Sequence, residues 1–461
     1  MHVSGPVTGG SRGWAFGGPT ADLAAQGYRQ DEYFVEGEAV RYGLAPGTTL
    51  DWDGQWKVRP MGSAPYTTRM VVVRPDEPAD FNGTVIVLWN NVSAGYENFG
   101  GGDSAEFFAG GYAYAAVSAQ RVGIHGTPEN PQGLRAWDPE RYGSLSIESD
   151  DYSFDIFTQA ADLVAPDRAR GDIDPLDGFE VRRLFAQGAS QSAARLATYF
   201  NAVQPLSRRF DAFFLVMYFG GGTPLEVGSD VMTVQGANDG TQPRIPEGLH
   251  LLRSDLETPV MVLNTECEAT SCYGVRQPDS DHFRYWEVAG ASHVSLQAIA
   301  SSAPRQERDF GFSLPLDELQ GINQVSLAPV VDAATQHLQA WVTEDIGPPV
   351  QPRIEFAGDP PEVVRDENGM ARGGIRLPEV EVPLAHNSAL RKGPDIFSRL
   401  VGSHETFSSQ RLRELYGSRE TYLGRFEQAA RAAVTASVVL PRDVDPMLAG
   451  AAAAVGEVDW S

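Results

Sequence analysis

The sequence contains very few cysteines. Its 461 residues include only two, Cys267 and Cys272. Two cysteines cannot build a disulfide framework or a cysteine-rich zinc site. The C-x4-C spacing could close a small loop, but because cytosolic proteins rarely keep disulfides, we expect both side chains to be free thiols.

Long hydrophobic runs and targeting segments are also lacking. The longest apolar stretch, "AFFLVMYF" at residues 212–219, is far shorter than the roughly 20 residues that a membrane-spanning helix needs. The first residues, "MHVSGPVTGG", have no basic region followed by an apolar core, so no signal peptide is predicted. We therefore expect a cytoplasmic protein that does not bind membranes.

Basic residues are scarce relative to acidic ones. The chain has 36 Lys and Arg against 61 Asp and Glu, for a formal net charge of -25. Phosphate backbones repel such a chain, so nucleic acid is not expected as a partner, and a neutral substrate is favoured over an anionic one. The hydrophobic fraction of 42% and charged fraction of 21% are typical of a soluble globular protein.

Recognised metal and cofactor motifs are missing as well. The sequence has no H-E-x-x-H, Walker or dinucleotide-binding fingerprint, and the "GGG" at residues 220–222 has no phosphate-loop context. Acidic residues do not cluster with histidine at ligand spacing. We predict that the protein requires no metal and no cofactor.

The sequence does contain apolar strands that alternate with helical patterns. Helices are predicted at residues 155–166, 192–203 and 328–342. Strands are predicted at residues 33–42, 67–75, 83–91, 111–119, 181–188, 211–219, 259–265 and 282–290. This alternation predicts an α/β fold with a doubly wound, mostly parallel sheet.

We expect three sections along the chain. Residues 1–60 read as a strand-rich N-terminal extension, and residues 61–345 as the α/β core. Within the core, the Gly-rich stretch 220–256 is predicted to be a lid or pocket wall, since long loops are usually functional. A Pro-rich linker at 346–354 begins a C-terminal appendage, residues 346–461, which is expected to pack on the core.

The stretch "FAQGASQSAARL" at residues 185–196 carries the main functional signal. It places Ser190 where an apolar strand turns directly into a helix, as in the G-x-S-x-G motif of nucleophilic hydrolases. Ser192 replaces the last glycine of that motif, at a modest steric cost because serine is small. The alternative interpretation is that Ser190 caps the helix.

A nucleophilic serine needs a histidine as base and a carboxylate to orient it. In α/β hydrolases with the G-x-S-x-G motif, these residues follow along the chain in the order Ser, acid, His. Of eight histidines, only His293 follows the last predicted strand after a short turn. "TECEA" offers Glu266 at a strand end and Glu268 two residues later. A short loop normally separates the strand from the acid, which favours Glu268, and Glu266 stays open.

The oxyanion of an acyl-transfer reaction needs N–H donors. One is expected from the backbone of Gln191, directly after Ser190. The second is expected from the "NNVSAG" loop after residues 84–89, from the backbone of Val92 or Ser93, or from the side chain of Asn91. The alternative is that this loop is an ordinary turn, which Asn and Gly favour for backbone reasons.

Several side chains near predicted strand ends are candidates for lining an apolar pocket. They are Trp89, Tyr96, Tyr218, Phe219 and His125. The alternative is that the aromatic residues belong to the core and that His125 has a structural or solvated place.

The sequence resembles the bacterial "alpha/beta hydrolase domain" proteins over nearly the whole chain. The resemblance rests on "GYRQDEYFVEGEAVRY", "GTVIVLWNNVSAGYE", "GYAYAAVSAQRVGIHG", "DDYSFDIFTQA", "FAQGASQSAARLATYFNAVQP", "RQPDSDHFRYWEVAGASH" and "RDENGMARGGIRLPEVEVPLA". It implies the alpha/beta hydrolase fold, with Ser190 as nucleophile, His293 as base and a glutamate of "TECEA" as acid. The G-x-S-Q-S form of the elbow also resembles that family.

We therefore expect a serine hydrolase that cleaves a carboxylic ester or lactone of a neutral, hydrophobic small molecule through an acyl-enzyme. Alternatives are an amidase or acyltransferase that uses the same residues, or a non-catalytic binding protein on a hydrolase scaffold. Assembly into a homo-oligomer stays open at this point.

Overall fold

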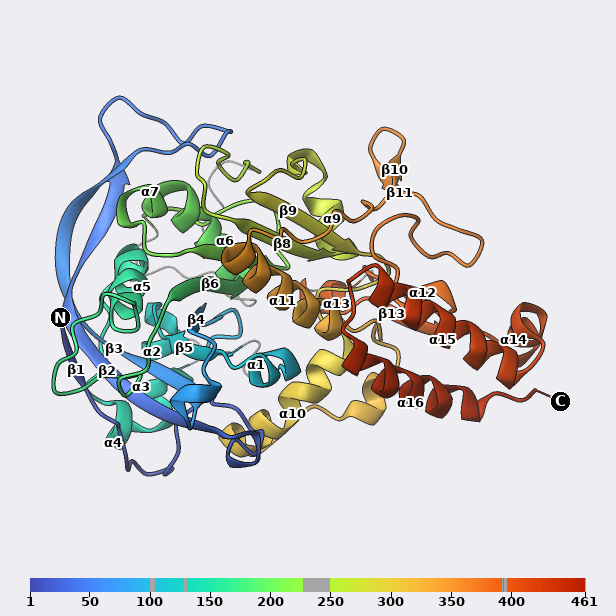
Figure 1. The fold of residues 1–461 in the computed structure, drawn as a ribbon, viewed down its shortest axis with the longest axis horizontal. Coiled ribbons are helices and arrows are strands. Elements are labelled where there is room, and N and C mark those ends of the chain that lie inside the picture. The colour runs from blue at the N-terminus through green and yellow to red at the C-terminus, as the bar shows by residue number, and fades with distance from the viewer. Residues whose placement is uncertain (100–103, 128–130, 227–248, 392, 394–395, 461) are drawn as a thin grey trace. The chain divides into compact units, whose positions relative to one another are not determined.

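The computed structural model describes residues 1–99, 104–127, 131–226, 249–391, 393 and 396–460 (Figure 1). The chain forms two compact units. The first comprises Met1–Val260 and Val275–Phe283, and the second comprises Met261–Gly274 and Arg284–Ser461. Of the predicted lid at 220–256, residues 227–248 lie outside the described residues.

The first unit is built on a sheet in the order β1-β2-β3-β5-β4-β6-β7. Strand β4 pairs in parallel with β5 and β6, and β6 pairs in parallel with β7, whereas the β1–β2, β2–β3 and β3–β5 pairs are antiparallel. The strands are β1 His2–Ser4, β2 Tyr28–Leu44, β3 Val58–Pro75, β4 Thr84–Trp89, β5 Ala113–Val117, β6 Arg183–Ala189 and β7 Ala212–Val216. Every residue of β4, β5 and β7 is buried, as expected for strands covered on both faces.

Short helices and one longer helix connect these strands. The α-helices are α1 Ala105–Ala109, α2 Arg121–His125, α3 Leu134–Trp137, α4 Pro139–Tyr142, α5 Ser153–Asp162, α6 Gln191–Thr198 and α7 Gln204–Ser207. The 3-10 turns are η1 Ala24–Gln26, η2 Pro78–Asp80 and η3 Asp150–Tyr152, and η4 Tyr199–Val203 is a π-helical turn that continues α6. The predicted helices at 155–166 and 192–203 correspond to α5 and to α6 with η4.

The N-terminal strands are part of the main sheet of the first unit. Strand β2 pairs with β3 along nearly its whole length, from Tyr28 opposite Pro75 to Leu44 opposite Val58, and β3 in turn pairs with β5. Figure 1 shows β2 and β3 as a long curved ribbon. A section boundary near residue 60, as expected from the sequence, would fall within this hairpin. The first compact unit instead keeps both strands and continues to Val260.

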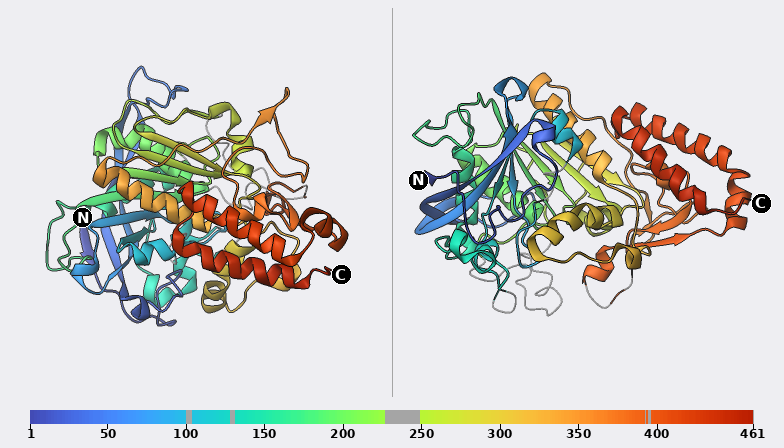
Figure 2. Two further views of the ribbon diagram at one scale, coloured as in Figure 1. Left: turned by 45° about the vertical axis from the view of Figure 1, so that its right-hand side comes forward. Right: turned by 90° about the horizontal axis from the view of Figure 1, so that it is seen from below.

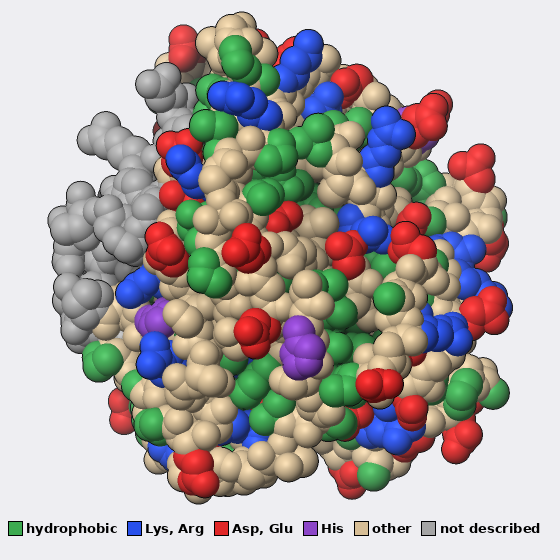
Figure 3. All heavy atoms as spheres, turned by 90° about the vertical axis from the view of Figure 1, so that its left-hand side faces the viewer, with side chains coloured by type: hydrophobic (Ala, Val, Ile, Leu, Met, Phe, Trp, Pro, Cys, Tyr) green, Lys and Arg blue, Asp and Glu red, His purple; other side chains and the backbone are tan. Residues whose placement is uncertain are grey.

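Acidic and basic side chains are interspersed on the face of the molecule drawn in Figure 3, which looks from the side of β1 and β2. On the described part of this face, the red and blue side chains do not separate into tracts of one sign. The excess of acidic residues in the chain is therefore not gathered into one patch there.

The second unit contains the neighbouring strands β8 Val260–Thr265 and β9 Phe283–Val288, which begin at its boundary with the first unit. Its other strands are β10 Phe356–Ala357, β11 Glu362–Val363, β12 Ala385–Ser388 and β13 Ser403–Thr406. Its α-helices are α9 Glu266–Ser271, α10 Leu296–Phe310, α11 Ala328–Glu344, α12 Pro378–Glu381, α13 Ile396–Leu400, α14 Ser409–Tyr416, α15 Arg419–Thr435 and α16 Val444–Ala454. The 3-10 turns are η5 Tyr273–Val275, η6 Leu316–Leu319, η7 Pro441–Asp443 and η8 Val455–Glu457.

Within the second unit, the C-terminal residues pack on β9 and α11. The Trp286 indole donates to the carbonyl of Pro349 at 2.9 Å, and the Ile354 N–H donates to the Glu287 carboxylate at 2.9 Å. The helices α15 and α16 lie side by side (Figure 2) and share an apolar cluster with α14. A substantial part of the C-terminal appendage therefore belongs to the same packed unit as β9.

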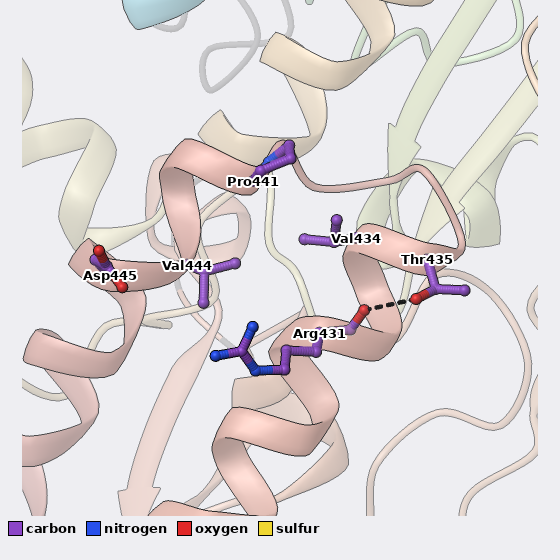
Figure 4. A pocket seen from close by; sticks show the side chains of 6 residues that line it. All are labelled: Arg431, Val434, Thr435, Pro441, Val444 and Asp445. Carbon is purple, nitrogen blue, oxygen red and sulfur yellow. Dashed lines mark hydrogen bonds between the residues drawn. The ribbon is translucent and has the colours of Figure 1, made fainter.

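A cleft of about 320 Å³ lies near α15 and α16, and Figure 4 shows the side chains that line it. It is lined by Arg431, Val434, Thr435, Pro441, Val444 and Asp445. None of these residues belongs to the predicted site, and we assign the cleft no function.

A buried ion-pair network ties β3 to the loop that follows β4. Arg69 and Glu97 are fully buried, and the Arg69 guanidinium lies 2.6 Å from Glu97 and 2.8 Å from Glu32. Arg141 pairs with the other oxygen of Glu32 at 2.7 Å, and the Asn90 amide donates to Glu97 at 3.3 Å. Two guanidinium groups and two carboxylates thus balance in charge inside the first unit, and they anchor the loop from which an oxyanion donor is expected.

We expect the Glu97→Gln substitution to lower the free energy of unfolding by about 3–4 kcal/mol, because it leaves the two buried guanidinium groups of Arg69 and Arg141 with Glu32 as their shared carboxylate in this network. Urea denaturation followed by circular dichroism measures this. The control is Glu427→Gln, which removes an exposed pair with Arg431 and should cost less than about 0.5 kcal/mol. An equal decrease in the free energy of unfolding in the two variants would contradict the larger contribution of the buried network to stability.

Candidate active site

Ser190 lies at a sharp turn between β6 and α6. Its backbone has φ 59° and ψ −119°, a positive φ that residues with a side chain rarely adopt. The Ser190 N–H donates to the Val216 carbonyl of the neighbouring strand at 2.9 Å, which holds the turn in place. A strained strand-to-helix turn that presents a serine is the geometry of a nucleophile elbow.

The helix-cap interpretation of Ser190 is wrong. Ser190 precedes α6, but its side chain makes no capping hydrogen bond. Its backbone conformation also differs from the extended one usual at a capping serine. The Ser190 residue is partly exposed, and its hydroxyl is not committed to stabilising the helix.

The elbow brings residues 188 and 192 into close contact. A Cβ atom added to Gly188 would lie 2.9 Å from the backbone carbon and oxygen of Ser192 and 3.0 Å from Leu196. Glycine is therefore required at 188, whereas a side chain fits at 192. Ser192 is fully buried and its hydroxyl has no hydrogen-bond partner in the described part of the chain.

The candidate oxyanion donors differ in how they are already bonded. The Ser93 N–H donates to the Asn91 side chain at 2.9 Å, and the Asn91 amide donates to the Ala189 carbonyl at 3.0 Å. The Val92 N–H makes a long contact, 3.4 Å, to the side-chain oxygen of Gln191. The backbone N–H of Gln191 is at the first position of α6, where no acceptor exists within the helix.

In the second unit, His293 and Glu268 form a direct hydrogen bond. The distance between His293 Nδ1 and Glu268 Oε1 is 2.7 Å. The other oxygen of Glu268 accepts from the N–H and the hydroxyl of Thr265, in a capping box at the start of α9. Burial alone would raise the pKa of Glu268, but the bonds from His293 and Thr265 outweigh it and hold the pKa below its usual range.

Glu266 has a different position. One of its oxygens lies 2.8 Å from the Arg365 guanidinium, and the other accepts from the Gly290 N–H at 2.8 Å. Gly290 begins the turn that leads to His293, and its φ of 70° suits glycine. The structure thus places Glu268 against the imidazole and Glu266 against the backbone of the turn.

Some of these contacts were not predicted from the sequence. The T-x-x-E pattern of Thr265 and Glu268 is a capping-box signature, and it would have indicated that Glu268 is held at a helix start. Arg365 lies far along the chain from Glu266, and no local pattern connects them. Ser190 belongs to the first unit and the His293–Glu268 pair to the second.

The predicted pocket residues have varied positions. Trp89 is 1% exposed, stacks on Phe157 with ring centres 4.7 Å apart and donates to Gln120, so it is a core residue rather than a pocket wall. Tyr218 is buried, whereas Tyr96 and Phe219 are partly exposed. A pocket role for these three stays a prediction.

His125 is bonded to the backbone. Its Nε2 accepts from the Ile147 N–H at 3.2 Å. Burial, with the positive charges of Arg121 and Arg135, lowers the pKa of His125 to about 4. A neutral imidazole that accepts a backbone hydrogen bond has a structural role.

Neither metal ligands nor a membrane span emerge from the part of the chain that the structure describes. Among those residues, no three His, Cys, Asp or Glu side chains are grouped so that they could hold a metal ion. Every helix there is too short or too polar to cross a bilayer. Cys267 and Cys272 are buried thiols, and neither is part of a disulfide among the described residues.

Comparison with known proteins places the chain in a family. The model of the family described as "Alpha/beta hydrolase domain" matches residues 3–449. The chain belongs to this family. Its alpha/beta hydrolase fold, with a large and mostly parallel sheet, agrees with the fold class predicted from the sequence. No curated protein matches the chain.

Solved structures similar to this chain include two esterases. The esterase Est22 with p-nitrophenol has 12% identity and a TM-score of 0.28, over 57% of this chain and 72% of that one. A cold-adapted esterase from an Arctic intertidal metagenomic library has 14% identity and a TM-score of 0.27, over 63% of this chain and 93% of that one. At TM-scores this low, neither similarity bears on substrate or mechanism.

The elbow geometry predicts opposite outcomes for two substitutions to alanine. Gly188→Ala should lower the free energy of unfolding by about 2–4 kcal/mol, because the new methyl group meets backbone atoms that cannot move aside. Ser192→Ala removes a buried hydroxyl that has no partner, so stability should be unchanged or rise by up to about 1 kcal/mol. Thermal unfolding of both variants tests this, and a well-folded Gly188→Ala protein would contradict the crowding.

Proposed function

We propose that this alpha/beta hydrolase is a serine hydrolase that cleaves a carboxylic ester or lactone through an acyl-enzyme. The observation that carries the proposal is the strained backbone of Ser190, whose hydroxyl does not cap the helix that follows. Strain of this kind persists only where the surrounding structure enforces it, and it is concentrated at functional sites. The bonded His293–Glu268 pair supplies the other chemical groups that the reaction needs.

In the proposed reaction, Ser190 Oγ attacks the substrate carbonyl carbon and its proton passes to His293 Nε2. His293 Nδ1 donates to Glu268, which fixes the tautomer and stabilises the imidazolium. The N–H groups of Gln191 and Val92 stabilise the oxyanion of the tetrahedral intermediate. The intermediate expels the alcohol, which takes the proton from His293 and leaves Ser190 acylated.

The second half of the proposed reaction repeats these roles with water. His293 takes a proton from a water molecule, whose oxygen attacks the acyl carbon. The ester bond to Ser190 then breaks, the serine oxygen recovers a proton from His293, and the carboxylic acid leaves. In a lactone the alcohol and acid are parts of one molecule, so the same steps open the ring.

For the substrate we propose a neutral, hydrophobic small molecule such as an aryl ester or a macrolactone. The net charge of -25 disfavours an anionic substrate. Tyr96 and Phe219 are partly exposed aromatic residues, and part of their surface would give such a substrate apolar contacts. No partner other than this substrate is part of the proposal.

Ser190→Ala should abolish hydrolysis of p-nitrophenyl esters and labelling by a fluorophosphonate probe, because it removes the attacking oxygen. Initial rates and mass spectrometry of the labelled peptide measure both. Ser192→Ala, two residues away, is the matched control and should keep activity and labelling at Ser190. Full activity in Ser190→Ala, or a label on another serine, would overturn the proposal.

The two glutamates next to β8 should differ in their effect on rate. Glu268→Gln should lower kcat by about a thousandfold, because the amide cannot stabilise the imidazolium and disturbs its tautomer. Glu266→Gln keeps the acceptor for Gly290 and weakens the pair with Arg365, so the loss should stay below about tenfold. Steady-state kinetics on one ester measures kcat for both variants. A larger decrease in kcat for Glu266→Gln than for Glu268→Gln would reverse the assignment of the acid.

A further inference from the structure

The side chain of Gln191 has an unusual set of contacts for a buried amide. Gln191 is 5% exposed, and its Oε1 faces the Val92 N–H at 3.4 Å. Its Nε2 is buried and has no acceptor within the described residues. Within the part of the chain that the structure describes, the hydrogen bond that holds this amide therefore involves a group that we propose as an oxyanion donor.

This contact is weak by any ordinary measure. Hydrogen bonds from N–H to oxygen have their optimum near 2.9–3.0 Å, and 3.4 Å lies beyond the usual range. A buried amide nitrogen without an acceptor costs about 1–3 kcal/mol, so the conformation of Gln191 is poorly satisfied at both ends. A side chain in this state is easily displaced.

The contact is also unnecessary for holding the loop in place. Asn91 already joins the loop to the elbow through the Ala189 carbonyl at 3.0 Å, and the loop closes on itself through Ser93 at 2.9 Å. The buried pair of Arg69 and Glu97 anchors its far side. A purely structural role thus does not account for the position of the Gln191 carbonyl.

We propose that the Gln191 side-chain oxygen is a stand-in for the substrate carbonyl oxygen. It accepts from the Val92 N–H while the site is empty, and it moves away when a substrate or transition-state analogue takes that hydrogen bond. This inference rests on the proposed function, since it needs Val92 as an oxyanion donor. It makes Gln191 a residue with two parts in the reaction, a backbone N–H that stabilises the oxyanion and a side chain that competes with it.

The nearly isosteric substitution Gln191→Glu tests the competition. A carboxylate accepts a stronger hydrogen bond from the Val92 N–H than an amide does, and its charge opposes the developing oxyanion. Second-order labelling of Ser190 by a fluorophosphonate, whose P=O oxygen occupies the same place, should fall at least tenfold at pH 8. The ratio of variant to wild-type rate should rise as the pH falls towards 5, because the introduced carboxylate becomes protonated and loses the charge that opposes the oxyanion.

The substitution Gln191→Met tests the same idea in the other direction. It keeps the length of the side chain but cannot compete strongly for the N–H, so an alkyl trifluoromethyl ketone should bind at least threefold more tightly than to the wild-type protein. Gln26→Glu, at an exposed position of the first unit, controls for the added charge and should change neither readout. Thermal unfolding of each variant confirms that it is folded.

The outcomes separate this inference from the proposed function. If Gln191→Glu and Gln191→Met lowered the labelling rate equally and independently of pH, the side chain would only pack and the inference would be overturned. Labelling of wild-type Ser190 would still support a serine hydrolase in that case. A wild-type protein that is neither labelled at Ser190 nor active on esters would refute the proposed function and the inference with it.

Discussion

The strand-to-helix turn at Ser190 is the constraint on which the site depends. The chain leaves β6 and enters α6 within one residue, which requires a positive φ at Ser190 and no side chain at Gly188. The Ser190 N–H is bonded to the Val216 carbonyl, so the neighbouring strand β7 holds the turn as firmly as its own sequence does. The cost of this backbone conformation is of the order of 1–3 kcal/mol, and the packed sheet around it supplies the compensation.

The loop after β4 depends on a second constraint, the burial of charge. Arg69, Glu97 and Glu32 have almost no exposed surface, and their burial is acceptable because each carboxylate lies within hydrogen-bond distance of the Arg69 guanidinium. Such a network tolerates little displacement, and it links β3 to the residues that precede and follow Val92. The backbone around Val92, a candidate oxyanion donor, is thus anchored to buried charges on both sides of it, through Asn90 and Glu97.

Two neighbouring glutamates show how local geometry separates similar residues. Glu266 and Glu268 lie in one turn of α9, and both are buried. Glu268 turns back to Thr265 and meets His293, whereas Glu266 accepts from the backbone of Gly290 and pairs with Arg365. One carboxylate orients the imidazole and the other orients the turn that carries it, which is a difference of environment rather than of chemistry.

The amino-acid sequence by itself predicted the fold class, which the family match confirms, and it supplied the candidate residues of the site, whose roles stay a prediction. Apolar strands alternating with helices predict a parallel sheet, and the order of Ser190, the two glutamates and His293 follows from chain position alone. Three features were decided only by tertiary structure: the contacts of each glutamate, the burial of Trp89 in the core, and the absence of a capping bond at Ser190. The burial of Trp89 and the contacts of the glutamates with His293, Gly290 and Arg365 depend on distances between residues far apart in the chain, whereas the missing cap at Ser190 depends on a backbone conformation that periodicity along the sequence does not encode.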